Sequence, residues 1–371
     1  MRTRGEPSHM TRLRARFERA SISPCRVSAL LLASGLLAMA PASWAQVDLG
    51  PVTVGAGLQT SFTHAQPNGG TSTDSFAADH VRLYVSGPVI DGIKFMLNTD
   101  YDSTTNKIGV MDAAAQFSIA PQVNIWAGRF LPPSDRANMY GPFYSHEWKV
   151  YTDGIQDGYP FIFQGRDNGV LYWGDFMKKV KVSAGVFDGK SATGNAKILG
   201  AARVQIDFWD PEDGYYLNGT YYGDKNLLSI GGATQVQDGH TATTLDFLME
   251  KKLPNKGVIS IESEFSDYNR LGGYSSAYAK SIGVYGLGSY LFPMEVKMGK
   301  YSGKFEILGK YAKAEYTHGH TPSYDQKTTE INFNYVMKQF KARLMSFYLD
   351  QRYNRLVTNT WQVGLGLQIQ M

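Results

Sequence analysis

Two short groups of residues carry side chains that could do chemistry. His318-Gly319-His320, with Asp325 close behind, offers imidazole and carboxylate groups of the kind that bind zinc. Two loop histidines without a third fixed ligand rarely hold a metal, so we expect no metal site and no cofactor. Ser145-His146 has the residue types of a nucleophile and its base. Adjacent side chains on an extended chain point apart, and no oxyanion-binding group is evident, so we do not expect an enzyme.

Charged residues recur at every second position of segments that are otherwise apolar. Arg82 stands between Val81 and Leu83, and the final segment 360–371 alternates without interruption between apolar and polar or glycine positions. Successive side chains of a β-strand point to opposite faces, so each such segment has one apolar and one polar face. The inner-wall charges expected from this pattern are Arg82, Lys94, Lys181, Arg203, Asp246, Glu262, Glu264 and Arg343.

These charges decide between two all-β architectures. A dry core could not hold them, because each unpaired buried ion costs several kcal/mol. On a soluble sandwich they would simply face solvent. Because an export leader precedes the same pattern, we expect an antiparallel transmembrane β-barrel, apolar outside against lipid and polar inside around water.

The leader is predicted over residues 1–45, with the transmembrane barrel over 46–371. Seven arginines precede an apolar stretch that runs from Val27 to about Met39, and Ser43-Trp44-Ala45 offers a cleavage site. Translation from Met10 would also leave a complete leader. The whole chain has 37 Lys+Arg and 33 Asp+Glu; subtracting the leader's 7 Arg and 2 Glu leaves 30 and 31. Nucleic-acid binding therefore has no support from charge, and the outer membrane of a Gram-negative bacterium is the expected location.

The chain has a single cysteine. The one cysteine, Cys25, lies in the predicted leader, so we expect a mature chain without disulfides. No Cys-x-x-Cys-His motif is present, so no c-type haem attachment is expected.

Sixteen segments with period-two alternation are readable after the leader. The run 215–222 could be counted as a seventeenth, but a bacterial barrel needs an even number of strands, so 209–226 is expected to be a long periplasmic connection. The expected strands are 51–63, 79–88, 92–101, 108–119, 121–130, 166–175, 178–188, 197–208, 227–237, 241–252, 256–268, 276–292, 302–316, 327–337, 338–350 and 359–371.

Residues 131–165 form the longest connection between the predicted extracellular strand ends. Such loops are usually functional or disordered, and the many aromatic residues here argue against disorder. We expect the loop to fold into the lumen and narrow it; an external lid or subunit latch is the alternative. The constriction residues expected from this placement are Arg129, Asp135, Arg136, Glu147, Lys149 and Arg166.

Four short motifs resemble outer-membrane porins of the phosphate-selective porin O and P type. They are Ala127-Gly-Arg-Phe-Leu-Pro-Pro133, Gln164-Gly-Arg-Asp-Asn-Gly-Val-Leu-Tyr-Trp173, Gly185-Val-Phe-Asp-Gly189 and Phe208-Trp-Asp-Pro211. The resemblance implies a 16-stranded, trimeric porin with a third loop that narrows the pore. Family members that select phosphate carry an arginine ladder and constriction lysines, whereas this loop has only Arg136 and Lys149 against four acids.

The function expected is therefore passive diffusion of small hydrophilic solutes and ions with weak ion preference. A phosphate-selective anion channel is the alternative, and a barrel that sheathes a partner protein is a further one. The expected partners are the lipid bilayer, lipopolysaccharide, small hydrophilic solutes and two further copies of the chain in a homotrimer.

Three further expectations concern side-chain placement. The bases Arg82, Lys94, Lys179, Lys181 and Arg203 should face the acids of 241–252 and 256–268 across the lumen, unless they pair with near neighbours. Arg166 should pair with Asp167 at the base of the loop. Aromatic residues expected at the membrane interfaces are Trp126, Tyr172, Trp173, Trp209, Tyr290, Phe292 and Trp361.

Overall fold

The structure is a computed structural model that describes residues 52–103, 106–151, 165–189, 197–271, 278–318, 323–355 and 358–371. The predicted leader, residues 152–164 of the long loop and His320 lie outside these residues. Within the described residues, no helix has both the length and the apolar character needed to cross a membrane.

Sixteen antiparallel strands form one closed barrel, which confirms the predicted fold and strand number. Each strand pairs with its neighbours in the sequence, and β1 closes the ring against β16. The strands are β1 (Thr53–Pro67), β2 (Thr73–Ile90), β3 (Ile93–Asp102), β4 (Lys107–Ala120), β5 (Val123–Phe130), β6 (Asp167–Phe176), β7 (Val180–Phe187), β8 (Leu199–Asp207), β9 (Leu227–Gln237), β10 (His240–Lys252), β11 (Val258–Asn269), β12 (Tyr278–Met298), β13 (Tyr301–His318), β14 (Tyr324–Lys338), β15 (Ala342–Tyr353) and β16 (Thr360–Gln370).

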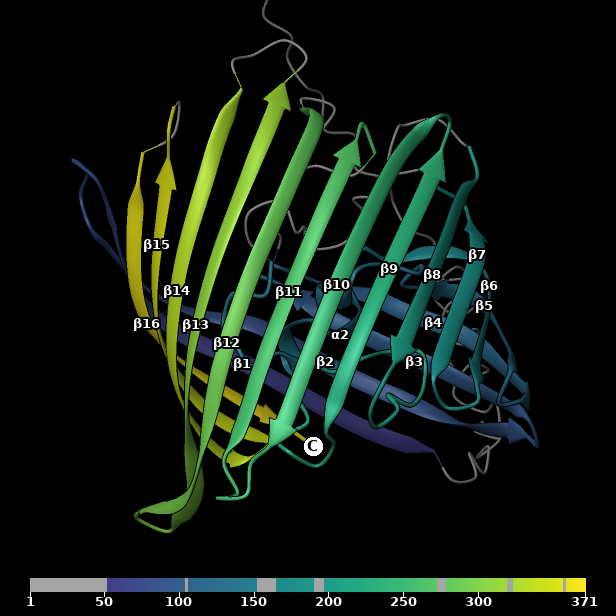
Figure 1. The fold of residues 1–371 in the computed structure, drawn as a ribbon, viewed down its shortest axis with the longest axis horizontal. Helices are drawn as coiled ribbons and strands as arrows, with labels where there is room; N and C mark the ends of the chain where they lie inside the picture. The colour runs from purple at the N-terminus through teal and green to yellow at the C-terminus, as the bar shows by residue number, and fades with distance from the viewer. Residues whose placement is uncertain are drawn as a thin grey trace, which may run out of the picture. The chain divides into compact units, whose positions relative to one another are not determined.

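The two ends of the barrel differ in the length of their connections. At the end that holds the chain's C-terminus, most turns are short, such as 91–92, 121–122 and 299–300. The hairpin of β12 and β13 extends beyond the other turns at this end (Figure 1). The long connection 131–166 leaves the opposite end. Outer-membrane barrels have short periplasmic turns and longer extracellular loops, which orients this barrel for the argument below.

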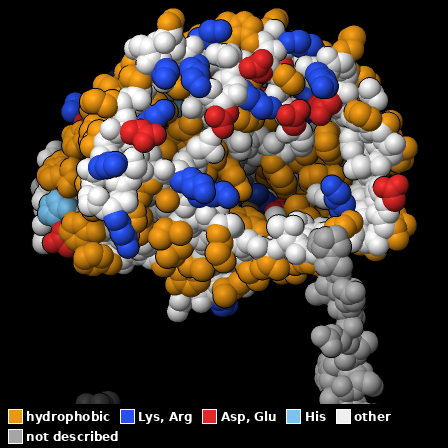
Figure 2. Space-filling model, turned by 90° about the horizontal axis from the view of Figure 1, so that it is seen from below, with side chains coloured by type: hydrophobic (Ala, Val, Ile, Leu, Met, Phe, Trp, Pro, Cys, Tyr) orange, Lys and Arg blue, Asp and Glu red, His pale blue; other side chains and the backbone are white. Residues whose placement is uncertain are grey.

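Alternation along each strand separates an apolar outer face from a polar inner one. Val81 and Leu83 are exposed while Arg82 between them is buried, and Val204 and Ile206 are exposed while Arg203 and Gln205 are buried. Seen from below, the space-filling view is hollowed at its centre, with basic side chains at the edge of the hollow (Figure 2).

The predicted interfacial aromatics divide between the two faces. Trp209, Phe292 and Trp361 are exposed on the outside, as expected. Trp126 and Trp173 are not interfacial: Trp126 is buried, and the two rings meet edge to face inside the barrel with Tyr215 beside them. The period-two pattern places both side chains inward, so proximity to a strand end was a misleading criterion for them.

Candidate functional site

The candidate site is the barrel lumen, and two segments that lie within it determine its shape. We call residues 131–151 the loop segment and residues 208–226, which join β8 to β9, the connection segment. The loop segment contains a short helix, α2 (Arg136–Tyr140), followed by the 3-10 turn η1 (Pro142–Tyr144). Figure 1 shows α2 within the barrel.

The loop segment begins its helix with a side-chain cap. Asp135 is the N-cap residue, and its carboxylate accepts hydrogen bonds from the backbone N–H of Asn138 at 2.8 Å and from Ser134 Oγ at 2.9 Å. Burial raises the pKa of Asp135, and the hydrogen bonds from Asn138 and Ser134 partly oppose that shift. Asp135, predicted to line the constriction, therefore has a structural role at the start of α2.

The loop segment is held by acids on the inner wall of β10 and β11. Glu264 Oε2 accepts the backbone N–H of Ala137 at 3.2 Å, and Glu262 Oε1 accepts the hydroxyl of Tyr140 at 2.9 Å. Arg136 lies 3.6 Å from Asp246, measured from Nε to Oδ1. These acids thus bind the loop segment at close range.

The wall of β13 and β14 holds the second half of the loop segment. Lys310 Nζ lies 3.1 Å from Glu147 Oε1 and donates to the carbonyl of Val150 at 2.8 Å. Glu330 Oε1 accepts the backbone N–H groups of both Trp148 and Lys149 at 3.1 Å. A loop fixed at its backbone by wall side chains on several strands is a rigid element of the lumen.

His146 of the loop segment also contacts the inner wall, at β12 and β13. Its Nδ1 lies 3.2 Å from Glu306 Oε1 and 3.3 Å from Ser289 Oγ. Burial alone would lower the pKa of His146, but the hydrogen bond to Glu306 and its charge raise it to about 9. The neighbouring Ser145 Oγ donates to the carbonyl of Glu147 at 2.8 Å, so Ser145 and His146 are engaged with different partners.

The connection segment also lies inside the barrel and binds the loop segment directly. Leu217 N–H donates to the carbonyl of Met139 at 3.2 Å, and Gly219 N–H donates to the carbonyl of Tyr144 at 2.8 Å. Arg136 forms a bidentate ion pair with Glu212, whose first contact, Nη1 to Oε1, is 3.1 Å. Both side chains are fully buried. Each compensates the charge of the other, because a buried ion without a partner costs several kcal/mol.

Basic and acidic wall groups do not face each other across water as expected. Arg203 of β8 binds Asp246 of β10, with Nη2 to Oδ1 at 2.8 Å, and only β9 separates these strands. Gly231 of β9 makes this pairing possible, because a Cβ there would lie 2.2 Å from Arg203 Nη2. The alternative expectation, that the wall charges pair with near neighbours, is confirmed for Arg203.

The other predicted wall bases have different surroundings. Arg82 Nε donates to Asp100 Oδ2 at 2.8 Å, and its guanidinium lies 4.8 Å from the Phe143 ring centre. Arg343 is fully buried and bonds to Gln368 and the Ser145 carbonyl. Lys181 Nζ donates to the backbone carbonyl of Glu212 at 2.8 Å, whereas Lys94 is exposed.

One predicted constriction base, Arg129, lies on the outer face of the barrel. Arg129 shares the face of Ile125 and Ala127, opposite buried Trp126 and Phe130, and donates to the carbonyl of Val110 at 3.1 Å. That face is the outer one, so Arg129 does not point into the lumen.

Arg166 is buried, but its partner is not the one expected. Its Nε lies 3.5 Å from Asp112 Oδ1. Asp167 instead accepts the backbone N–H groups of Gly189 at 2.6 Å and Asn168 at 2.8 Å. The predicted Arg166–Asp167 pair is therefore wrong, because β6 begins at Asp167 and directs that carboxylate to the neighbouring turn.

An open space remains between the loop segment and the wall of β1 and β2. This cavity of about 250 Å³ is lined by Gln59, Asp79 and His80 of the wall and by Pro142 and 148–151 of the loop segment. Lys149 is exposed in it, unlike Arg136 and Glu147, which are buried. Lys149 is thus the predicted constriction residue whose charge meets water.

Metal binding finds no support in the described part of the chain. Among these residues, no group of three or more His, Cys, Asp or Glu side chains is arranged to hold a metal ion. His320 of the predicted His-Gly-His set lies outside the described residues.

Comparison with solved structures relates this geometry to known proteins. The chain is similar to OprB of Pseudomonas putida, with a TM-score of 0.60, 9% identity and coverage of 86% of this chain and 94% of the other. It is similar to an anion-selective porin of Comamonas acidovorans, with a TM-score of 0.54, 12% identity and coverage of 86% and 99%. It is also similar to the trimer form of OmpT of Vibrio cholerae, with a TM-score of 0.53, 12% identity and coverage of 86% of this chain and 99% of the other.

The fold is that of outer-membrane porins. At these identities the likeness concerns the fold alone. No family model and no curated relative matches the chain.

Sequence reasoning missed the connection segment as a lumen element. It was expected as a periplasmic connection, yet Glu212, Tyr215 and Leu217 are buried. The inward glycines of the closing strands signal the loop segment instead: a Cβ at Gly366 would lie 2.3 Å from the Trp148 ring, and one at Gly57 would lie 2.7 Å from Phe143. Glycine on a polar inner face indicates that something bulky approaches it.

Proposed function

We propose that this protein is a porin that allows passive diffusion of small hydrophilic solutes and ions through a narrow, water-filled passage. The observation that carries the proposal is the cavity between the loop segment and the wall of β1 and β2. The opposite side of the lumen, from β8 to β14, is occupied by the loop and connection segments and their ion pairs. The loop therefore narrows the pore toward one wall.

Weak ion preference is the selectivity that the lining supports. The cavity has one acid, Asp79, and two nitrogen bases, His80 and Lys149. His80 Nδ1 already bonds Asp100 at 2.9 Å, and Asp100 also binds Arg82. A passage with charges of both signs discriminates less than a ring of one sign.

An anion-selective channel is the second candidate, and one observation favours it. Lys149 presents an exposed ammonium group from the loop into the passage, whereas the loop's acids Asp135 and Glu147 are buried in hydrogen bonds. A sheath for a partner protein is not favoured, because it would need a lumen without the loop segment.

We place the protein in the outer membrane, in contact with lipid and lipopolysaccharide, as a homotrimer. Support comes from the apolar outer face and from the likeness of the fold to that of the OmpT trimer form.

Planar-bilayer recording tests the proposal and its alternative. The mature protein should conduct, with a small reversal potential in a KCl gradient and little block by millimolar phosphate. If phosphate blocks strongly, Lys149→Ala should relieve the block, whereas Lys94→Ala, which removes another exposed inner base, should not. Folded, membrane-inserted protein that carries no current would overturn the porin proposal.

A further inference from the structure

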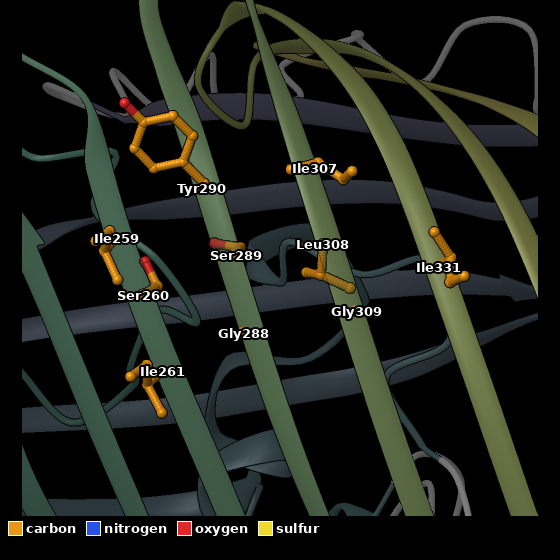
Figure 3. A pocket seen from close by; sticks show the side chains of 10 residues that line it. All are labelled: Ile259, Ser260, Ile261, Gly288, Ser289, Tyr290, Ile307, Leu308, Gly309 and Ile331. Atoms are coloured by element: carbon orange, nitrogen blue, oxygen red, sulfur yellow. The ribbon is translucent and has the colours of Figure 1, made fainter.

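A groove of about 600 Å³ crosses the outer, lipid-facing surface of β11 to β14 (Figure 3). Its floor is formed at Gly288 of β12 and Gly309 of β13, which are register partners. Gly286, next on the same outer face of β12, extends the region without side chains. Aliphatic and aromatic side chains border the groove: Ile259, Ile261, Tyr290, Ile307 and Ile331.

The glycines leave room that the barrel itself does not need. A Cβ at Gly286, Gly288 or Gly309 would meet no atom within 4 Å, and none of the three has a positive φ. Neither backbone conformation nor close packing therefore requires glycine at these positions. Glycine in a strand interior weakens the strand, so a molecule that fits above these residues gives them a use.

A row of three bases crosses the outer face between the groove and the end with long connections. Lys313 of β13 is the register partner of Lys327 of β14, which is in turn the partner of Arg352 of β15. Lys313 lies four residues beyond Gly309, or about 13 Å along the strand, toward the end with long connections. Like charges directly opposite one another destabilise a sheet, so Lys327, which has a base on each side, is the position where a bound anion would relieve repulsion.

Nearby acids form ion pairs with the bases at the two ends of the row, Lys313 and Arg352, but not with the central Lys327. Lys313 Nζ bonds Glu315 Oε1 at 2.8 Å, and Arg352 Nε bonds Asp350 Oδ2 at 2.8 Å. Lys327 is exposed and forms no ion pair with another described residue; Asp325, two positions away on β14, is the partner of Glu315 in register. The row thus has a cation at its centre that is available to a ligand.

We propose that this surface binds a phosphorylated, multiply acylated glycolipid of the outer leaflet, with an acyl chain in the groove and a phosphate on Lys327. The inference rests on the proposed outer-membrane location, which puts the end with long connections outside. A base about 13 Å from the floor of an apolar groove, on the headgroup side, matches a lipid whose acyl chain lies in the groove and whose anionic head reaches that base. Basic residues near a membrane surface attract anionic headgroups in this way.

Lipid titration of the full mature protein in detergent, followed by native mass spectrometry, tests the proposal with purified lipid A as the probe. One variant removes the row (Lys313→Gln, Lys327→Gln and Arg352→Gln), and another fills the groove (Gly288→Leu and Gly309→Leu). Matched controls act elsewhere on the barrel. Lys251→Gln, Lys297→Gln and Lys300→Gln remove three bases at the periplasmic end, and Gly200→Leu with Gly232→Leu fills outward positions on β8 and β9.

Loss of the row should weaken lipid A binding at least about fivefold, since a base near the surface contributes about a factor of five and Lys327 is the base of the row without an ion pair to a described residue. Filling the groove should weaken it about tenfold. Both controls should bind as the wild type does, and channel conductance should stay unchanged in all four, which separates this test from that of the proposed function.

Three outcomes would overturn the proposal. Wild-type affinity in both test variants would show that the surface is not the site. Equal competition by phosphatidylglycerol would show that an ordinary anionic phospholipid occupies it. A change in oligomer size on filling the groove would identify a second copy of the chain as the occupant.

Discussion

At the scale of single residues, the lumen is organised by charges that have partners. A buried ion without a partner costs several kcal/mol, so Arg136, Arg203 and Glu147 are tolerated only because Glu212, Asp246 and Lys310 lie against them. Lys149 needs no ion-pair partner, because its side chain is exposed and water solvates its charge. Solute contact is therefore expected at Lys149 rather than at the more numerous buried charges.

His146 provides a pH-dependent test at this scale. Its pKa, raised to about 9 beside Glu306, exceeds the ordinary value of 6.5, so folding is favoured by its protonation. This contribution is fully present below pH 6.5 and disappears as pH rises through 9; it amounts to about 3 kcal/mol at most. Urea unfolding in lipid vesicles at pH 6 and pH 10 should show the loss.

The matched variant for this test is His146→Gln. It should unfold with a much smaller difference between the two pH values, because the titrating group is gone. An equal pH dependence in wild type and variant would mean that other groups dominate and that the His146–Glu306 contact contributes little.

At the scale of elements, the loop and connection segments form one unit inside the barrel. The Arg136–Glu212 pair joins them, and backbone hydrogen bonds at Leu217 and Gly219 run beside it. Neither segment could bury its polar groups alone, because each satisfies donors and acceptors of the other. The width of the passage should therefore depend on both segments.

Breaking this pair should loosen both elements. Glu212→Gln removes the nearer counter-charge of buried Arg136 and leaves Asp246 at 3.6 Å, so it should cost about 3 kcal/mol. We expect larger or noisier single-channel currents, because the loop segment can then move from its wall. The double variant Arg136→Met with Glu212→Leu should recover much of the stability, since it removes both charges.

Lys297→Gln on the β12–β13 hairpin is the control for a change in charge outside the lumen. If Glu212→Gln gives currents as quiet as those of this control, the connection segment does not hold the loop in place.

Period-two alternation is enough to predict the sixteen strands and the inward direction of residues such as Arg82, Lys181 and Arg203. It cannot predict that Arg203 binds Asp246 while Lys94 remains in water, because alternation fixes the direction of a side chain and not its height or its partner. The connection segment was missed for a related reason. Its contacts join residues about 80 positions apart, such as Tyr215 and Leu131, and no local pattern specifies them.

At the scale of the whole molecule, the barrel wall and its contents have separate roles. The closed ring of strands satisfies the backbone against lipid, and its apolar exterior faces the membrane. The two inner segments lie inside the barrel, and a cavity remains between the loop segment and the wall of β1 and β2, where we propose that solutes pass. Under the proposed function, solute size and charge should therefore be discriminated at the loop segment rather than by the wall as a whole.

The most direct test of this account is thiol modification of the passage during single-channel recording. The mature chain is predicted to lack cysteine, so Lys149→Cys introduces a single thiol, and Lys300→Cys on the periplasmic hairpin serves as the control. A bulky methanethiosulfonate reagent should sharply reduce the current through Lys149→Cys and leave wild type and Lys300→Cys unchanged. Open, unaltered current through fully modified Lys149→Cys would show that solutes do not pass between the loop segment and β1–β2.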